Sequence, residues 1–230
     1  LYYGQAGDTF LFGSELKSLK VFPDWKGKIN RDVLALFFRF GYVPAPWSIY
    51  EDIFKLPPAH FLIIKDNGRD IGDPICYWDL NKIACDEVEM RNDSAIQLAD
   101  KLEILLLDSV KRQMSADVPL GSFLSVGYDS STVTALMQAQ SERPIKTFTI
   151  GFKESNYNEA SHARRVANHL GTQHTELFVT PYDAINTIPA LPDIYDEPFA
   201  DTSQIPTYLV SKLARKDVTV CLSGDGGDEL

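Results

Sequence analysis

The stretch Pro119-Leu-Gly-Ser-Phe-Leu-Ser-Val-Gly-Tyr-Asp-Ser-Ser131 decides the fold predicted for this chain of 230 residues. Its first half is short and mostly apolar, as expected of a strand that is buried on both faces. Its second half is small and polar, and a helix is predicted from Thr132 onward. Such a strand, loop and helix aim backbone N–H groups and a helix dipole at one point, which suits a phosphate. The alternative is that Asp129 or Ser130 merely caps the helix.

The chain on both sides of this loop alternates strands with helices. A long helix with apolar residues at helical spacing precedes it at 95–114. Alternation of this kind predicts the α/β class, with a parallel sheet covered by helices on both faces. The later strands are expected at 145–152, 174–180 and 218–222, and the later helices at 158–170, 203–216 and, in part, 182–195.

The first 80 residues have a different, β-rich pattern. Residues 1–12 are predicted to form a hairpin that turns at Ala6-Gly7-Asp8, and residues 61–65 a further strand. The polar stretch 81–91 is interpreted as a linker. Because the chain begins within a strand and without a methionine, we expect it to be a piece of a longer protein.

Composition excludes several classes of partner. The net charge is −10 and no basic run is present, which argues against nucleic acid. No apolar stretch reaches the ~18 residues of a membrane span, and no signal peptide opens the chain. The cysteines Cys76, Cys85 and Cys221 are spaced for neither a zinc site nor a disulfide framework. We therefore expect a cytoplasmic protein without nucleic-acid or membrane partners.

Small and polar residues follow three of the predicted strands. In an open parallel sheet, ligands bind beyond the carboxyl ends of the strands, where Ser125-Val126-Gly127, Ile150-Gly151 and residues 223–229 would lie. The carboxylates of the last loop suit Mg²⁺, which phosphates need as a bridging charge. A Gly- and Asp-rich loop is by itself more typical of a surface turn, but two such loops at one sheet edge favour a ligand site.

Two loops carry a family resemblance. Ser125-Val126-Gly127-Tyr128-Asp129-Ser130 resembles the Ser-Gly-Gly-x-Asp-Ser PP-loop of the ATP-pyrophosphatase superfamily, whose members cleave ATP to AMP and pyrophosphate to adenylate a substrate. Ser223-Gly-Asp-Gly-Gly-Asp-Glu229 resembles the Ser-Gly-x-Gly-x-Asp-Glu motif of glutamine-hydrolysing asparagine synthetases. Further segments resemble that family in the same order along the chain: 1–4, 14–17, 147–151, 157–160, 169–174 and 196–201.

The resemblance implies a domain organisation. The family joins an Ntn-type glutaminase, which begins with a nucleophilic cysteine, to a synthetase with an adenine nucleotide alpha hydrolase-like fold. Residues 1–80 would be the C-terminal end of the glutaminase domain with its linker, and residues 81–230 the N-terminal part of the synthetase domain. No cysteine precedes Cys76, so no ammonia-releasing site is assigned here. We expect residues 1–230 alone to be inactive.

The resemblance also implies a reaction. Aspartate, glutamine and ATP would give asparagine, glutamate, AMP and pyrophosphate through an aspartyl-adenylate, with ATP and Mg²⁺ required and ammonia as the alternative nitrogen donor. Another amide-forming ligase of the superfamily is a rival, such as a β-lactam synthetase or an enzyme that tailors peptides or polymers. A catalytically impaired nucleotide-binding homologue is a third reading, because Val126 replaces a glycine. The resemblance leaves a homodimer open.

Each motif residue receives a role from the resemblance. Asp225 stands where the family often has a glutamate tied to forming the aspartyl-adenylate, and Asp129 with Asp228 would hold Mg²⁺. The residues that would line the AMP part of the site, mostly through their backbone, are Leu124, Ile150, Ser223 and Gly224. Those that would surround the pyrophosphate are Ser125, Gly127, Asp129 and Ser130.

The remaining candidates are weaker. We expect structural roles for the scattered histidines His60, His162, His169 and His174, and domain-interface packing for residues 42–47. The segment 196–201 either borders the aspartate or ATP site or packs Phe199 into the core.

Overall fold

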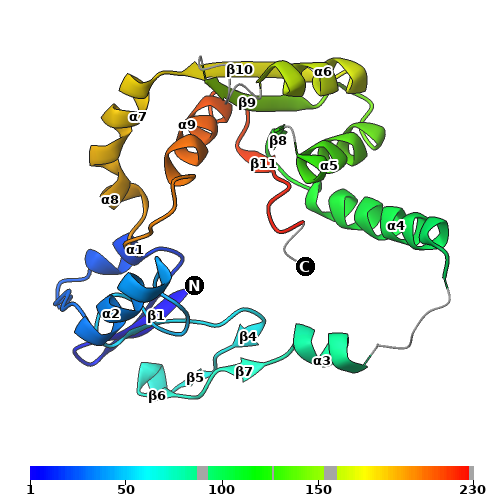
Figure 1. The fold of residues 1–230 in the computed structure, drawn as a ribbon. Helices are drawn as coiled ribbons and strands as arrows, with labels where there is room; N and C mark the ends of the chain where they lie inside the picture. The colour runs from blue at the N-terminus through cyan, green and yellow to red at the C-terminus, as the bar shows by residue number, and fades with distance from the viewer. Residues whose placement is uncertain (87–92, 126, 153–159, 228–230) are drawn as a thin grey trace. The chain divides into compact units, whose positions relative to one another are not determined.

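The structure is a computed structural model that describes residues 1–86, 93–125, 127–152 and 160–227. It divides into two compact units, which can be followed along the chain in Figure 1. Unit 1 contains Leu1–Arg91 and Pro189–Asp201, and unit 2 contains Asn92–Ile188 and Thr202–Leu230. The chain therefore leaves unit 2 after Ile188, contributes a short segment to unit 1 and returns at Thr202.

Unit 2 is built on a four-stranded parallel sheet with the order β10-β9-β8-β11. The strands are β8 (Leu120–Phe123), β9 (Lys146–Phe152), β10 (Gln173–Val179) and β11 (Val220–Leu222). In the register, Gly121 of β8 lies opposite Lys146 of β9 and Cys221 of β11. The strand that precedes the PP-loop-like motif, β8, thus lies inside the sheet between β9 and β11.

Helices cover both faces of this sheet, which confirms the predicted α/β fold. On one face Phe148 packs with Leu213 and Ala214 of α9 (Gln204–Ala214). On the other face Leu124 packs with Ala163 and Ala167 of α6 (Ala160–Leu170). The remaining helices of unit 2 are α4 (Ala95–Gln113), α5 (Tyr128–Ala139) and α7 (Pro181–Thr187).

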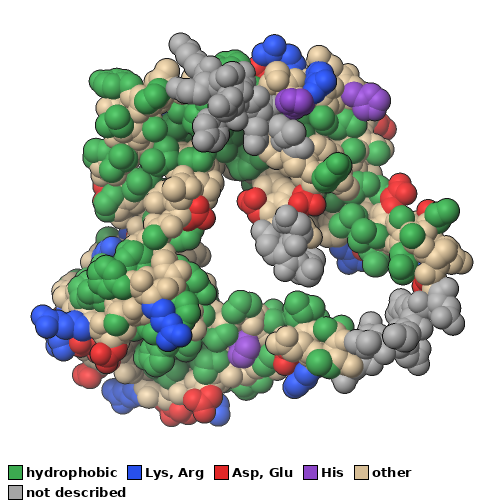
Figure 2. Space-filling model, viewed as in Figure 1, with side chains coloured by type: hydrophobic (Ala, Val, Ile, Leu, Met, Phe, Trp, Pro, Cys, Tyr) green, Lys and Arg blue, Asp and Glu red, His purple; other side chains and the backbone are tan. Residues whose placement is uncertain are grey.

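The predicted long helix α4 begins with a capping box between Ser94 and Gln97. Its apolar periodicity is confirmed, but burial is limited to its C-terminal part, where Val110 contacts α5 residues such as Met137. Large apolar side chains along the rest of the helix are exposed, as Figure 2 shows. They are Ile96, Leu98, Leu102, Ile104 and Leu105. In the part of the chain that the structure describes, no helix is long and apolar enough to cross a membrane.

Unit 1 contains an antiparallel sheet with the order β2-β1-β3. Its strands are β1 (Tyr2–Ala6), β2 (Thr9–Gly13) and β3 (Ile53–Lys55), and its first two helices are α1 (Leu16–Lys20) and α2 (Arg31–Phe40). The predicted hairpin is confirmed, with Gly7 at φ 61° in its turn. The buried core of the unit consists of Leu16, Leu19, Val33, Val43, Ile49 and Ile53.

One prediction for the end of unit 1 is wrong. Residues 61–65 do not form one strand, because β4 (His60–Phe61) pairs with β7 (Ile75–Cys76) while β5 (Ile64–Lys65) pairs with β6 (Asp70–Ile71) across the turn η1 (Asp66–Gly68). The stretch interpreted as a linker contains α3 (Leu80–Asp86). The Asp79 carboxylate supports its first turn by accepting a hydrogen bond from the Asn81 amide at 3.0 Å.

The segment between α7 and α9 is mostly helical. It runs through η3 (Ile188–Ala190) and α8 (Leu191–Ile194), each of which contains one proline. This confirms the partly helical, proline-broken character predicted for 182–195. Most of the segment belongs to unit 1, although the elements on either side of it in sequence belong to unit 2.

Candidate functional site

A pocket of about 410 Å³ lies in unit 2 at the carboxyl edge of the sheet, where ligands of such sheets bind. It is bounded by the loops that follow β8 and β11, by β9 and by the start of α9. Apart from Asp228, which lies outside the described residues, every predicted site residue lines it. These residues are Leu124, Ser125, Gly127, Asp129, Ser130, Ile150, Ser223, Gly224 and Asp225.

The loop after β8 is closed by hydrogen bonds to the Ser130 hydroxyl. That oxygen accepts from the Ser125 amide at 3.2 Å, donates to the Gly127 carbonyl at 3.2 Å, and lies 2.8 Å from Ser125 Oγ. The Gly127 amide in turn donates to Ser125 Oγ at 3.2 Å. Ser125, Gly127 and Ser130 of this loop are therefore tied to one another by their own small polar groups.

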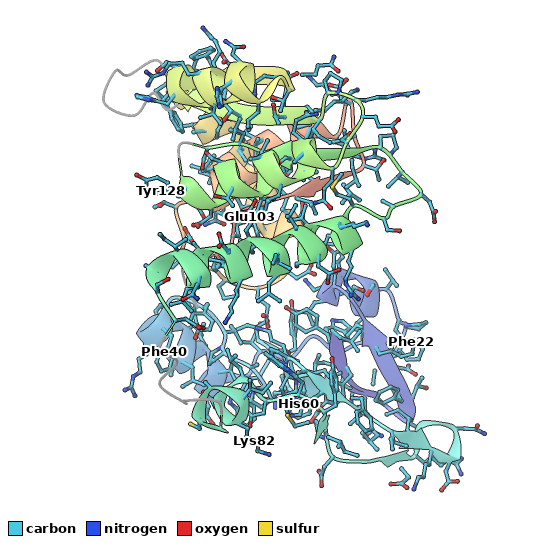
Figure 3. The ribbon with its side chains drawn as sticks, turned by 90° about the vertical axis from the view of Figure 1, so that its right-hand side faces the viewer. Phe22, Phe40, His60, Lys82, Glu103 and Tyr128 are labelled. Atoms are coloured by element: carbon cyan, nitrogen blue, oxygen red, sulfur yellow. The ribbon has the colours of Figure 1, made fainter. Side chains whose placement is uncertain are left out.

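The start of α5 argues against the simple capping interpretation of this loop. Its N-cap is Gly127, at φ −65° and ψ 149°, and no side chain caps the helix. Asp129 lies in the first turn instead, where the helix dipole favours a negative charge. Tyr128 points outward at the beginning of the helix and is 93% exposed (Figure 3). The loop thus presents a helix N-terminus and small polar groups to the pocket.

The loops that follow β8 and β11 meet backbone to backbone. A Cβ atom at Gly227 would lie 2.8 Å from Asp129 Cγ, and one at Gly224 would lie 2.5 Å from the Ser130 nitrogen. Only residues without a side chain fit at such distances. Gly224 and Gly227 therefore allow the contact that the sequence predicted for the two loops.

The Asp225 carboxylate is exposed at the pocket and is tied to its own loop. Its Oδ2 accepts a hydrogen bond from Ser223 Oγ at 3.1 Å, and its amide donates to the same hydroxyl at 3.4 Å. This arrangement holds the carboxylate beside the loop backbone. The acidic group of Asp225 therefore lies at the pocket, at the position where the resemblance indicated that the family often has a glutamate.

Leu124 and Ile150 contribute to the pocket in different ways. The Leu124 side chain is 1% exposed and packs against α6, so its backbone is what it offers to a ligand. Its amide donates to the Phe148 carbonyl at 2.9 Å, and its carbonyl accepts from the Thr149 hydroxyl. Ile150 lies in β9 and is half-buried. The mostly backbone contacts to AMP that the resemblance implied stay a prediction.

The sequence interpretation missed one wall of the pocket. It is made by Ser203 and by the first turns of α9, with Pro206, Thr207 and Val210. These residues have the spacing i, i+3, i+4 and i+7, which places them on one face of a helix. That spacing was the available signal, but it does not say which side of the sheet α9 covers. Phe123, Phe148 and Thr149 also line the pocket.

Two predicted features cannot be located. Val126 and Asp228 both lie outside the described residues, so a magnesium site shared by Asp129 and Asp228 stays a prediction. Within the described ranges, no group of three or more histidine, cysteine, aspartate or glutamate side chains is arranged to hold a metal ion.

The next residues are the weaker candidates, which are the histidines, the segment 196–201 and residues 42–47. His174 is buried and its Nδ1 lies 2.9 Å from the Thr147 hydroxyl, while His60 Nδ1 lies 2.7 Å from the Pro58 carbonyl. In the segment 196–201 the buried side chains are Asp196 and Glu197, whereas Phe199 is 39% exposed. Of the two alternatives for this segment, the one in which Phe199 packs into the core is therefore wrong. Among residues 42–47, for which domain-interface packing was expected, Val43 is buried in the core of unit 1.

Unit 2 is thus an α/β unit with a pocket at the carboxyl edge of its parallel sheet, and this places the chain among the α/β proteins that bind ligands at that edge. Comparison with known families is more specific. Residues 101–230 match the asparagine synthase family, and residues 1–78 match the glutamine amidotransferase domain. The chain belongs to the asparagine synthase family.

Individual relatives agree with this assignment. The chain is 40% identical over 232 residues to a putative glutamine-hydrolysing asparagine synthetase 2 of Methanocaldococcus jannaschii, covering 100% of this chain and 44% of the relative. It is 33% identical to asparagine synthetase 1 of Bacillus subtilis, covering 100% of this chain and 35% of the relative. The human asparagine synthetase is 36% identical over 141 residues, which are 57% of this chain and 25% of that protein. The chain thus spans less than half the length of these relatives.

Proposed function

We propose that this chain is part of an ATP-dependent amide-forming ligase that makes asparagine from aspartate. The observation that supports this most strongly is the contact between the two motif loops at Asp129 and Ser130, which together line one pocket. Membership of the asparagine synthase family supports ATP as the substrate, and the names of the relatives support aspartate and glutamine.

The proposed first step forms an adenylate. A carboxylate oxygen of aspartate attacks the α-phosphorus of ATP, the bond to the bridging oxygen breaks, and pyrophosphate leaves. The loop 125–130 would surround the pyrophosphate with small polar groups at the start of α5, where a helix N-terminus favours anions. The AMP part would lie along the backbone of Leu124, Ile150, Ser223 and Gly224.

The acidic residues require a cation in this proposal. Asp129 belongs to the loop that would surround the pyrophosphate, and a carboxylate beside phosphates is repelled unless a metal bridges them. The residues that would hold Mg²⁺ are Asp129 and Asp228, since Gly227 lies against Asp129. The ion would offset the charge of the departing pyrophosphate. Asp225 would serve in formation of the aspartyl-adenylate.

In the second step ammonia attacks the adenylated carboxyl carbon, AMP leaves, and the amide of asparagine results. We propose that residues 1–80 are the C-terminal end of the glutaminase domain that releases this ammonia, followed by its linker, and that residues 81–230 begin the synthetase domain. The match of residues 1–78 to the amidotransferase domain supports this division. The enzyme is proposed to act in the cytoplasm on small-molecule substrates.

The test is product analysis with the complete protein, aspartate, ATP, Mg²⁺ and either glutamine or ammonium. Asparagine, AMP and pyrophosphate in equal amounts are expected. ADP as the nucleotide product, or turnover only with a different acceptor, would contradict the proposal and favour another ligase of the superfamily. Asp129→Asn should abolish pyrophosphate formation, and Asp100→Asn, an exposed aspartate on α4, is the matched control.

A further inference from the structure

The segment Pro189–Asp201 interrupts unit 2 and packs in unit 1. Lys17 of α1 donates a hydrogen bond to the Ile194 carbonyl at 3.3 Å and forms an ion pair with Asp196 at 3.6 Å. The Ala200 amide donates to the Gly41 carbonyl at 2.7 Å, next to the end of α2. Figure 1 shows α8 beside α1, as these contacts require. The segment is therefore held to unit 1 at several points along its length.

A second ion pair of the segment joins Glu197, whose side chain is 9% exposed, to Lys55, whose side chain is 22% exposed. The Glu197 carboxylate forms an ion pair with Lys55 Nζ at 2.6 Å and accepts hydrogen bonds from the Ile49 amide at 2.7 Å and the Tyr2 hydroxyl at 3.2 Å. A buried carboxylate needs such partners, because its transfer from water is costly. Burial and the Glu197 charge raise the pKa of Tyr2, so its hydroxyl stays protonated as a donor.

This anchor lies close in sequence to the nucleotide pocket of unit 2. The segment ends at Asp201, and the chain then enters α9, where Ser203, Pro206 and Thr207 line the pocket. A chain that is tied down just before α9 restricts the conformations of this pocket wall. Binding then costs less, because the wall is already ordered when the ligand arrives.

We propose that Glu197 is a positioning residue for nucleotide binding: it anchors the segment 189–201 in unit 1 and thereby pre-orders the start of α9 at the pocket. The inference rests on the proposed function, since it takes the ligand of the pocket to be a nucleotide. It assigns Glu197 a role beyond the stability of unit 1.

The test measures equilibrium binding of AMP and of ATP with Mg²⁺ to the complete protein by calorimetry. Glu197→Gln is expected to weaken binding by about tenfold, the effect of one charge-assisted contact, with an equal rise in the KM for ATP and little change in kcat. Glu51→Gln is the matched control, because Glu51 also pairs with a lysine of unit 1, Lys28, at 2.6 Å but is remote in sequence from the segment. It should bind nucleotide like the wild type.

A milder pair of variants covers the case in which Glu197→Gln does not fold. Lys17→Met loosens the same segment from a half-exposed position and should weaken AMP binding severalfold, whereas Lys28→Met should not. Wild-type affinity in both segment variants, or a lower melting temperature and kcat with unchanged affinity, would overturn the inference and leave the proposed function standing. Absence of AMP and ATP binding by the wild type would overturn both.

Discussion

Gly224 lies so close to Ser130 that a Cβ atom at position 224 would stand 2.5 Å from the Ser130 amide nitrogen. The two residues belong to loops that follow neighbouring parallel strands, β11 and β8. The backbone of one loop thus rests on the first turn of the helix that follows the other. This contact brings the two motifs into one pocket, and it leaves no room for a side chain.

The first prediction is that Gly224→Ala separates the two loops. The added methyl group would meet backbone atoms of Asp129 and Ser130, which cannot turn away as a flexible side chain can. Affinity for AMP should fall by about tenfold or more in equilibrium binding to the complete protein. The control is Gly226→Asn, because nothing lies within 4 Å of a Cβ atom at Gly226 and asparagine is among the residues least strained at a positive φ such as its 82°. Equal affinities for the two variants would contradict the prediction.

The second prediction concerns the Ser130 hydroxyl. Ser130→Ala removes the group that joins the Ser125 amide, Ser125 Oγ and the Gly127 carbonyl. We expect a loss of about 1–2 kcal/mol in transition-state stabilisation, or roughly a fivefold to thirtyfold lower rate of ATP–pyrophosphate exchange. Ser131→Ala, one residue further along α5, is the control. A rate within a factor of about two of the control would show that the hydroxyl is dispensable.

The third prediction is that Val126→Gly raises activity. Valine is β-branched and is poorly suited to a position where the family has glycine, and a strained backbone there costs on the order of 1–3 kcal/mol. Position 126 lies outside the described residues, so the prediction depends on the motif alone. ATP–pyrophosphate exchange with aspartate should rise roughly tenfold to a hundredfold in the complete protein. An unchanged rate in an already active enzyme would mean that the valine is accommodated.

The fourth prediction is a pH dependence of local stability at His174. Burial lowers the pKa of this side chain below its ordinary value of 6.5, although the neighbouring Glu176 opposes the shift and Arg164 adds to it. In the part of the chain that is described, its Nε2 is buried without a hydrogen-bond partner, and Glu176 Oε1 lies 3.5 Å away. As the pH falls through about 6.5, the unfolded chain takes up the proton first, so stability is lost.

Hydrogen exchange of the β10 amides measures this local stability directly. Protection should decrease between about pH 7 and pH 5.5, after correction for the intrinsic exchange rate, as the unfolded-state histidine titrates. His174→Asn keeps a polar atom near the Thr147 hydroxyl and should flatten that pH dependence. His169→Asn, an exposed position on α6, should retain it. The same pH dependence in both variants would contradict the assignment to His174.

Much of unit 2 could be predicted because its signals are local. The alternation of apolar strands with amphipathic helices specifies a parallel sheet, and the carboxyl ends of parallel strands share one edge. Residues that are far apart in sequence, such as Ser125, Ile150 and Asp225, could therefore be assigned to one edge of the sheet from the sequence, and they line one pocket in the structure. Gly224 and Gly227 were part of that signal, since they permit the close approach of the loops.

Other features depend on which distant surface a segment meets, and a local pattern does not contain that information. Strands β4 and β5 are separated because each finds a different partner in β7 and β6. The spacing of Ser203, Pro206 and Thr207 predicts a helix face, but only the packing of α9 on the sheet turns that face into a pocket wall.

Glu197 shows the same division most clearly. The sequence alone showed that residues 196–201 resemble a family motif and contain Pro198. The tertiary structure alone decided that Lys55, Ile49 and Tyr2 surround the Glu197 carboxylate. The physical reason is that a buried charge is stabilised only by donors brought to it from distant parts of the chain, and their arrival depends on the folding of the whole unit.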